Sequence, residues 1–142
     1  MPGASTDILI DVPPKVIYDV VLDFENYPQF LPDVKKAIVE KEKGKQIIAS
    51  FEISVVKKIH YTLLFTPVPA KKISWNFMKG DLFKDNRGSW EFEEVKKGQT
   101  RAIYKVEVDF GFLVPSMITN RLVGNSLPTM MKRFKDRAEK LA

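Results

Sequence analysis

Apolar and polar residues alternate most regularly between residues 100 and 112. The apolar positions of this segment share one parity: Ala102, Tyr104, Val106, Val108, Phe110 and Phe112. The positions between them are mostly charged: Arg101, Lys105, Glu107 and Asp109, with Ile103 as the one apolar exception. Successive side chains of a β-strand point to opposite faces. The pattern therefore predicts a strand with one apolar face and one charged face.

Shorter alternating segments precede this strand. We expect strands near residues 8–12, 35–42, 47–55, 59–65, 73–77 and 90–92, of which 35–42 is a lysine-rich, solvated edge. A hairpin turn is expected around Gly44, and we interpret Gly80, Gly88 and Gly98 as turn glycines. Connections of this length predict an antiparallel meander.

Two segments have helical spacing instead. Pro13 and Pro14 end the first strand, and proline suits the first turn of a helix, so residues 14–24 are predicted to be helical. A second, long helix is predicted for residues 115–141. Its later half has one apolar stripe: Val123, Leu127, Met130, Met131, Phe134, Ala138 and Leu141.

The first half of the C-terminal helix does not follow this stripe. Its apolar side chains are on a different face of the helix from the stripe: Met117, Ile118 and Leu122. Pro128 is expected to kink the helix. One interpretation is a bent gate over a cavity mouth, or a contact with a membrane or a partner. The other is a helix that bends to follow a curved sheet.

These elements define the predicted fold class. We expect a single α+β domain over residues 1–142, in which a curved antiparallel sheet of six or seven strands wraps around a long C-terminal helix, with short helices after the first strand. One helix cannot fill so wide a sheet, so an apolar cavity is expected. The candidate cavity residues are Phe30, Trp75, Phe77, Trp90, Phe92, Tyr104, Phe110, Ile118 and Leu122. For each residue alone, simple core packing is the competing interpretation.

The amino-acid composition limits the metal sites, catalytic groups and partners that can be expected. The chain has no cysteine, one histidine and a formal charge of +5. We therefore expect no metal, no cofactor and no Ser–His or Cys–His catalytic pair, and His60 should point outward. No apolar run is long enough to span a membrane and no signal pattern is present, which favours a cytoplasmic protein, with peripheral membrane contact as an open option. The positive charge indicates either anionic partners, such as RNA or lipid head groups, or an ordinary solvated surface.

Three segments resemble a known family. Residues 16–32 contain Asp23, then Tyr27-Pro28, then Phe30-Leu31-Pro32, and they are similar to the first-helix motif of the START-like helix-grip superfamily, in its coenzyme Q-binding and ribosome-association-toxin branch. This superfamily is also called the polyketide cyclase/dehydrase and lipid-transport superfamily. Residues 88–92 and 108–112 are similar to its later strands. The branch often continues Phe-Leu-Pro with tryptophan, where this chain has Asp33.

The resemblance implies that the cavity binds a hydrophobic small molecule: a lipid, an isoprenoid quinone or a polyketide-like compound. Two alternatives stay open, an aromatic polyketide cyclase or dehydratase using the same cavity, and a ribosome- or RNA-associated regulator using the basic surface. Tyr27, Phe30 and Leu31 follow the first helix on a proline-restricted loop. They are expected either to close over a ligand or to pin that loop to the core.

Overall fold

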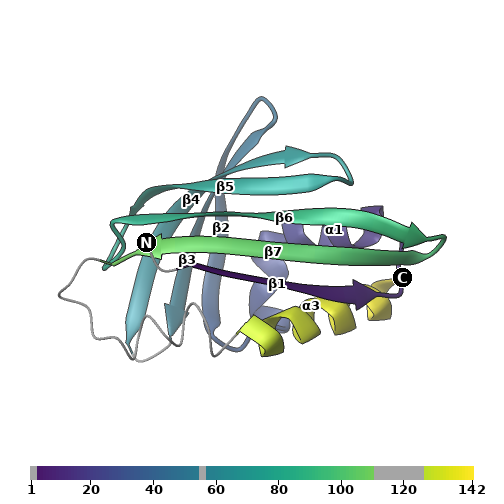
Figure 1. Cartoon of the computed structure of the whole chain (residues 1–142). Helices are drawn as coiled ribbons and strands as arrows, with labels where there is room; N and C mark the ends of the chain where they lie inside the picture. Colours follow the sequence, from purple (N-terminus) through teal and green to yellow (C-terminus); the bar gives the residue numbers. More distant parts are fainter. Residues whose placement is uncertain (1–2, 55–56, 111–126) are drawn as a thin grey trace.

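The computed structural model describes residues 3–54, 57–110 and 127–142 (Figure 1). Its elements follow the predicted order of a strand, a helix, a meander and a C-terminal helix. They are β1 (Gly3–Ile10), α1 (Pro14–Leu22), the 3-10 helix η1 (Phe24–Gln29), β2 (Val34–Lys43), β3 (Gln46–Ser54), β4 (Lys58–Val68), β5 (Lys72–Gly80), β6 (Asp85–Lys96), β7 (Gln99–Asp109) and α3 (Leu127–Leu141).

The strands form one antiparallel sheet in the order β1-β7-β6-β5-β4-β3-β2. From β2 to β7 each strand pairs with its neighbour in sequence, which confirms the predicted meander. β1 returns to the far edge and pairs with β7, from Gly3 opposite Glu107 to Ile10 opposite Thr100. The first strand therefore lies beside the last one, a long-range pairing that no local pattern contains.

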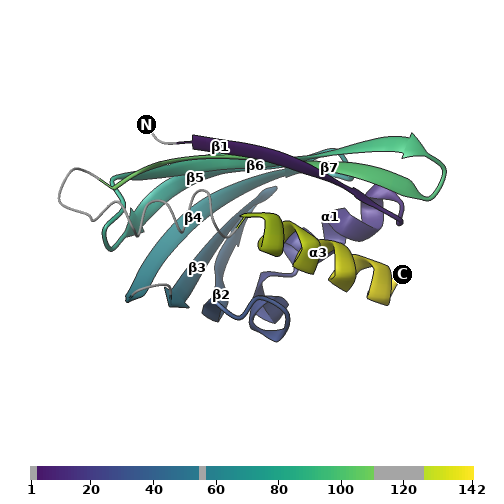
Figure 2. The ribbon, with the colours of Figure 1, turned by 60° about the horizontal axis from the view of Figure 1, so that its bottom comes forward.

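The sheet curves, and the helices lie on its concave side (Figure 2). α3 packs against β1 and α1, while η1 packs against β2. Met131, Phe134 and Ala138 of the predicted stripe are buried, whereas Leu141 at the helix end is exposed. This arrangement confirms the α+β helix-grip prediction. The predicted helical residues 115–126 lie outside the described residues, and Pro128 is in the first turn of α3 as described.

Several predicted boundaries are wrong. The first strand spans Gly3–Ile10 rather than residues 8–12, and Val12 is buried beyond its end. The first helix ends at Leu22 rather than at residue 24, and the 3-10 helix η1 follows it, in agreement with the expected short helices after the first strand. Pro28 lies inside that short helix, in which proline breaks fewer hydrogen bonds than it would in a long α-helix.

Gly80 and Gly88 are not turn glycines. Gly80 lies in β5 opposite Tyr61, and Gly88 lies in β6 between Trp75 and Val106. A Cβ atom built on Gly88 would stand 2.5 Å from Cζ2 of Trp75 and 2.2 Å from the carbonyl oxygen of Lys105. Gly88 is therefore required by close approach inside the sheet. Gly98 has a φ of 81° and does occupy a turn, as predicted.

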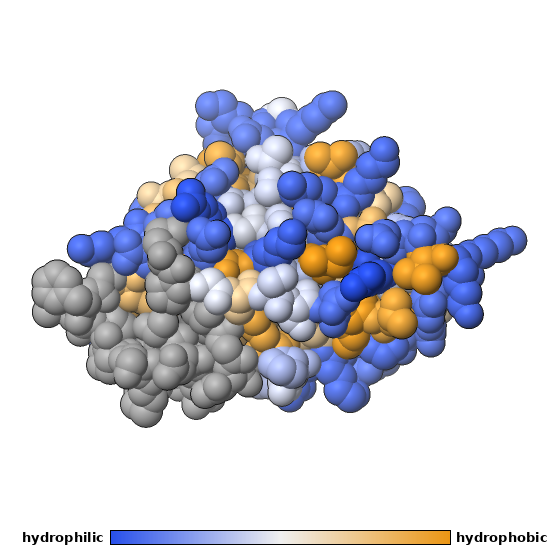
Figure 3. Space-filling view, viewed as in Figure 1, coloured by the Kyte–Doolittle hydropathy of each residue, from blue (hydrophilic) through white to orange (hydrophobic). Residues whose placement is uncertain are grey.

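The outer surface is mostly polar (Figure 3), with isolated apolar side chains such as Met78 and Val95. His60 is exposed there, as expected, with Nε2 2.8 Å from Glu52 Oε1 and Nδ1 3.2 Å from Asp81 Oδ2.

In the described ranges no helix is long and apolar enough to cross a membrane. Those same ranges contain no group of three or more His, Asp or Glu side chains arranged to hold a metal ion.

Candidate ligand cavity between the sheet and the C-terminal helix

A cavity of about 620 Å³ lies between the concave face of the sheet, the segment after η1, and α3. Apolar and aromatic side chains make up most of its wall: Tyr27, Leu31, Pro32, Val34, Phe51, Ile53, Tyr61, Leu63, Phe65, Trp75, Phe83, Trp90, Tyr104, Val106, Val108, Met130 and Phe134. The other described lining residues are Asp33, Asn86, Thr129 and Arg133. Its size and composition are typical of a small-molecule site, for which volumes of about 300–1,000 Å³ are usual.

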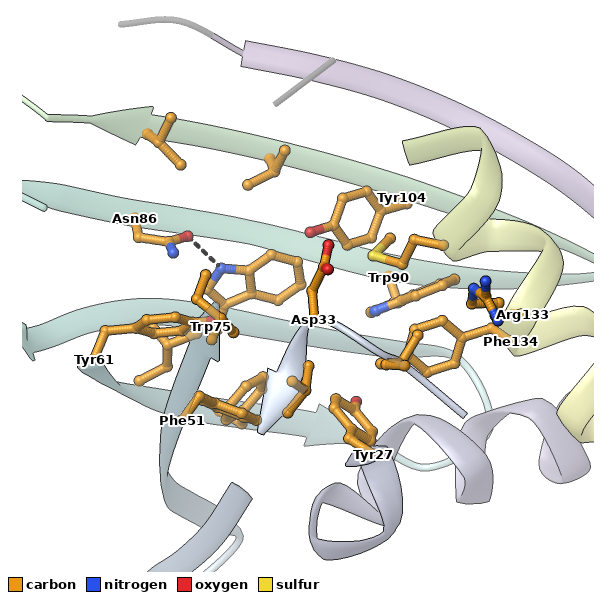
Figure 4. A pocket seen from close by; sticks show the side chains of 18 of the residues that line it. Tyr27, Asp33, Phe51, Tyr61, Trp75, Asn86, Trp90, Tyr104, Arg133 and Phe134 are labelled. Carbon is orange, nitrogen blue, oxygen red and sulfur yellow. Dashed lines mark hydrogen bonds between the residues drawn. The ribbon is translucent and has the colours of Figure 1, made fainter. Parts of the chain in front are cut away.

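Three of the nine candidate residues line this cavity. Trp75 comes from β5, Trp90 from β6 and Tyr104 from β7, and Figure 4 shows all three around the same space. They form a continuous aromatic wall, because the ring centroid of Tyr104 is 5.5 Å from that of Trp75 and 5.0 Å from that of Trp90. Their expected role in binding stays a prediction.

Four other candidates lie outside the lining and pack against other rings. Phe92 stacks on Trp90 with ring centroids 6.1 Å apart, away from the cavity. Phe77 and Phe110 both contact Phe83, at 6.1 Å and 4.7 Å between centroids. The structure therefore places these three side chains in the packing around the cavity rather than on its surface. Ile118 and Leu122 lie outside the described residues.

The fourth candidate outside the lining is Phe30. It belongs to the loop after the first helix, which was expected either to close over a ligand or to be pinned to the core. Its ring lies 5.2 Å from that of Phe134, and the guanidinium carbon of Arg137 lies 5.3 Å from the ring centre. Tyr27 and Leu31 do line the cavity. Phe30 therefore fixes the segment to α3, while Tyr27 and Leu31 form part of the cavity wall, and closure over a ligand stays a prediction.

Tyr27 is held by a hydrogen bond as well as by packing. Its hydroxyl donates to the carbonyl of Val21 in the last turn of α1. Carbonyls in the last turn of a helix lack a helical partner, so this bond caps α1 and fixes η1 at the same time. Burial, with smaller contributions from Tyr104 and Tyr61, raises the pKa of the Tyr27 phenol well above 10.0, which keeps the group a neutral donor.

Trp75 is positioned by two neighbours in β6. Its indole Nε1 donates to Oδ1 of Asn86 at 3.0 Å, and both residues are buried. Its ring lies over Gly88, where no side chain competes for space. A buried indole N–H needs a partner, and Asn86 supplies it. The hydrogen bond and the glycine together hold the tryptophan flat against the sheet as part of the cavity wall.

Three other polar groups of the wall have no hydrogen-bond partner in the part of the chain that the structure describes. The hydroxyls of Tyr61 and Tyr104 and the indole N–H of Trp90 make no hydrogen bond to any described residue. Yet no buried side-chain nitrogen or oxygen of the described residues lacks a partner, so these three groups must reach open space. Burial raises the pKa of both tyrosines, so they stay neutral and can donate to a ligand or accept from one.

Two charged groups complete the described lining, Asp33 and Arg133. Asp33 directly precedes β2, and its carboxylate points into the same space as the hydroxyl of Tyr104 (Figure 4). Arg133 comes from α3. Neither side chain forms an ion pair within the described part of the chain.

Sequence reasoning missed several lining residues for different reasons. Phe51, Tyr61 and Phe65 alternate on the inward faces of predicted strands, so the signal was present but did not distinguish cavity wall from core. Phe83 had no such signal, because it follows Leu82, whose φ of 66° reverses the chain. Arg133 lies outside the predicted apolar stripe of its helix, so the pattern did not mark it as a lining residue.

The family match agrees with this geometry. The family model described as "Polyketide cyclase / dehydrase and lipid transport" matches residues 10–135, and the chain belongs to this family. Among curated proteins it is similar to the ribosome association toxin RatA of Vibrio cholerae, with 22% identity over 99% of this chain and 98% of that protein. RatA of Pseudomonas aeruginosa is 25% identical over 94% of this chain and 92% of that protein.

Solved structures show the same fold. A START superfamily protein from Mycobacterium smegmatis superposes with a TM-score of 0.85 at 19% identity, over 99% of both chains. The Zhui aromatase/cyclase from Streptomyces sp. R1128 superposes with a TM-score of 0.83 at 13% identity, over 98% of this chain and 94% of that one. At these identities the likeness establishes the helix-grip fold alone.

Proposed function

We propose that this protein binds a hydrophobic small molecule, such as a lipid, an isoprenoid quinone or a polyketide-like compound, in the cavity between the sheet and α3. The observation that carries the proposal is the cavity of about 620 Å³, with a largely aromatic wall and a few polar groups that bond to none of the described residues. A core that existed only for stability would be filled, because empty space in a core costs free energy.

Apolar burial supplies the affinity. A ligand that loses about 300 Å² of apolar surface gains roughly 7 kcal/mol at about 25 cal/mol per Å². Part of this gain is lost to immobilisation of the ligand, so a dissociation constant between about 10 μM and about 1 mM is expected for a neutral ring compound without optimised polar contacts. The unused groups of Tyr61, Tyr104 and Trp90 would then set orientation rather than overall strength.

Titration with diphenylhexatriene tests the proposal, since this neutral probe fluoresces only in apolar surroundings. The wild type should bind it with saturation. Val106→Trp introduces a bulky ring at a buried lining position and should weaken binding at least tenfold. Val95→Trp, at an exposed position of β6, is the matched control and should bind as the wild type does. Circular dichroism checks that each variant is folded.

Two results would contradict the proposal. One is a wild type that gives no saturable signal with the probe. The other is equal binding by the Val106→Trp and Val95→Trp variants, because that would place the probe outside the cavity. If Val106→Trp does not fold, Leu63→Trp on β4, also a lining residue, replaces it.

A second candidate function is association with ribosomes. It is favoured by the names of the curated relatives and by the formal charge of +5. Co-sedimentation with ribosomes tests it: electrostatic binding to RNA should fall steeply between about 50 mM and about 200 mM salt. Cavity binding of a neutral ligand should not change over that range, so the two functions can be measured separately.

A cyclase or dehydratase activity needs an acid or a base in the cavity. The only histidine of the chain, His60, lies on the outer surface, and the described lining offers Asp33 and Arg133 as its ionic groups. Such an activity would therefore depend on Asp33 as the proton acceptor. We rank it below binding because no second residue within 3–54, 57–110 or 127–142 forms a pair with the carboxylate of Asp33.

A further inference from the structure

Asp33 has a fixed backbone and an unused side chain. Its carbonyl oxygen accepts a hydrogen bond from the amide of Ser54 at 2.8 Å, and the amide of the next residue, Val34, donates to the carbonyl of Leu31 at 3.0 Å. These bonds tie the segment to β3 and to the end of the η1 loop. The carboxylate itself bonds to no described residue, although its side chain is only half-exposed and lines the cavity.

The charged groups around Asp33 do not neutralise it. Lys35, two residues further on, directs its ammonium group to the carbonyl of Pro32 at 2.9 Å and is exposed. Arg133 also lines the cavity, forms no ion pair with Asp33 within 4.0 Å, and is exposed. The uncharged groups nearest the same space are the phenols of Tyr104 and Tyr61, which remain protonated.

A carboxylate can only accept hydrogen bonds, whereas the phenols and the indole N–H of Trp90 can donate. A ligand hydroxyl at Asp33 would form a charge-assisted bond, which is stronger than a bond between neutral groups. A ligand carboxylate at the same place would meet a like charge in partly desolvated surroundings, where repulsion is stronger than in water. The wall is thus selective for the polar end of its ligand.

We infer that Asp33 determines specificity: the cavity takes a hydrophobic ligand whose polar end donates a hydrogen bond, such as an alcohol or a phenol, and rejects ligands that end in a carboxylate. This inference rests on the proposed binding function and adds to it the chemical class of the ligand. The rival arrangement is an anionic ligand held by Arg133. Arg133 is the more exposed of the two groups, so water screens it more.

Three ligands with one ring system separate these alternatives: pyrene, hydroxypyrene and pyrene carboxylate. Each can be titrated at about pH 7 by the quenching of tryptophan emission, because Trp75 and Trp90 lie in the cavity wall. In the wild type, hydroxypyrene should bind at least tenfold more tightly than pyrene carboxylate. Asp33→Asn keeps the shape and removes the charge, and should bring the two affinities to within threefold of each other. Arg133→Gln removes the rival group and should keep the tenfold preference for hydroxypyrene over pyrene carboxylate. Lys132→Gln, at an exposed position of α3 outside the lining, is the matched control and should bind all three compounds as the wild type does.

The outcomes are distinct. If pyrene binds and the wild type shows no preference for hydroxypyrene over the carboxylate, the role of Asp33 is wrong while cavity binding stands. If the carboxylate binds more tightly and Arg133→Gln abolishes this, the rival arrangement replaces the inference. If none of the three compounds binds, the proposed function fails, and the inference fails with it.

Discussion

Three tyrosines that line one cavity should respond differently to the same substitution. Tyr27 donates its hydroxyl to the carbonyl of Val21, whereas the hydroxyls of Tyr61 and Tyr104 have no partner among the described residues. Changing each tyrosine to phenylalanine removes one oxygen atom and keeps the ring packing. The comparison therefore isolates what each hydroxyl does in the protein without a ligand.

The structure sets the expected magnitudes. Tyr27→Phe loses a hydrogen bond that contributes about 1 kcal/mol and leaves a buried helix-end carbonyl without its partner, which costs about 1 kcal/mol more. The free energy of unfolding should fall by about 2 kcal/mol, or roughly 6 °C in melting temperature for a chain of this size. Tyr61→Phe and Tyr104→Phe lose no bond and should stay within about 0.5 kcal/mol of the wild type.

Urea unfolding, followed by far-ultraviolet circular dichroism, measures the three differences, and an unchanged m-value shows that they report stability. In ligand binding the size of the effects should follow the opposite order. Tyr104→Phe should weaken the binding of hydroxypyrene, although its free energy of unfolding is unchanged. If Tyr61→Phe and Tyr104→Phe destabilise the protein as much as Tyr27→Phe, their hydroxyls are bonded within the protein, and the account of free polar groups in the cavity is refuted.

Two further predictions concern the sheet. Gly88→Ala should lower the free energy of unfolding by at least about 2 kcal/mol and shift the fluorescence emission of Trp75, because the new Cβ would overlap the Trp75 ring and the neighbouring backbone. The control is Gly44→Ala, a position with open space but a φ of 61°, which should lower it by only about 1 kcal/mol. Equal losses in the two variants would contradict the close approach at Gly88. The protonated ring of His60 donates hydrogen bonds to the carboxylates of Glu52 and Asp81, and these bonds raise the pKa of His60 above 6.5. The extra stability of the wild type over His60→Gln should therefore be present below about pH 6.5 and disappear as pH rises through the raised pKa. Melting temperatures from about pH 5.5 to about pH 8.5 measure this, and a difference that grows with pH would contradict it.

Much of the fold was predictable because most of the sheet is built from local hairpins with clean alternation. The strand that ends at Asp109 is an example: its buried Ala102, Val106 and Val108 alternate with exposed charges, as predicted. The pairing of β1 with β7 was not predictable in this way. Paired residues such as Ile10 and Thr100 are far apart in sequence, and the local sequence of either strand does not indicate its distant partner or the register of the pairing.

The site was less predictable than the fold. Alternation shows that Trp90 and Phe92 both point inward, but only Trp90 lines the cavity, because the boundary between cavity and core depends on where α3 and η1 lie. Gly88 was misread because a glycine within a strand and a glycine in a turn look the same until the ring that covers it is known. Asp33 was visible only as a departure from the family motif, and its cavity position came from the structure.

The most direct test of the central claim is native mass spectrometry of the purified protein, before and after incubation with a neutral hydroxylated hydrophobe, followed by organic extraction. The account predicts a discrete added mass, one ligand per chain, that extracts into organic solvent and is lost in Val106→Trp but kept in Val95→Trp. A protein that keeps its apo mass after incubation, or an added mass that both variants retain equally, would contradict binding in the cavity.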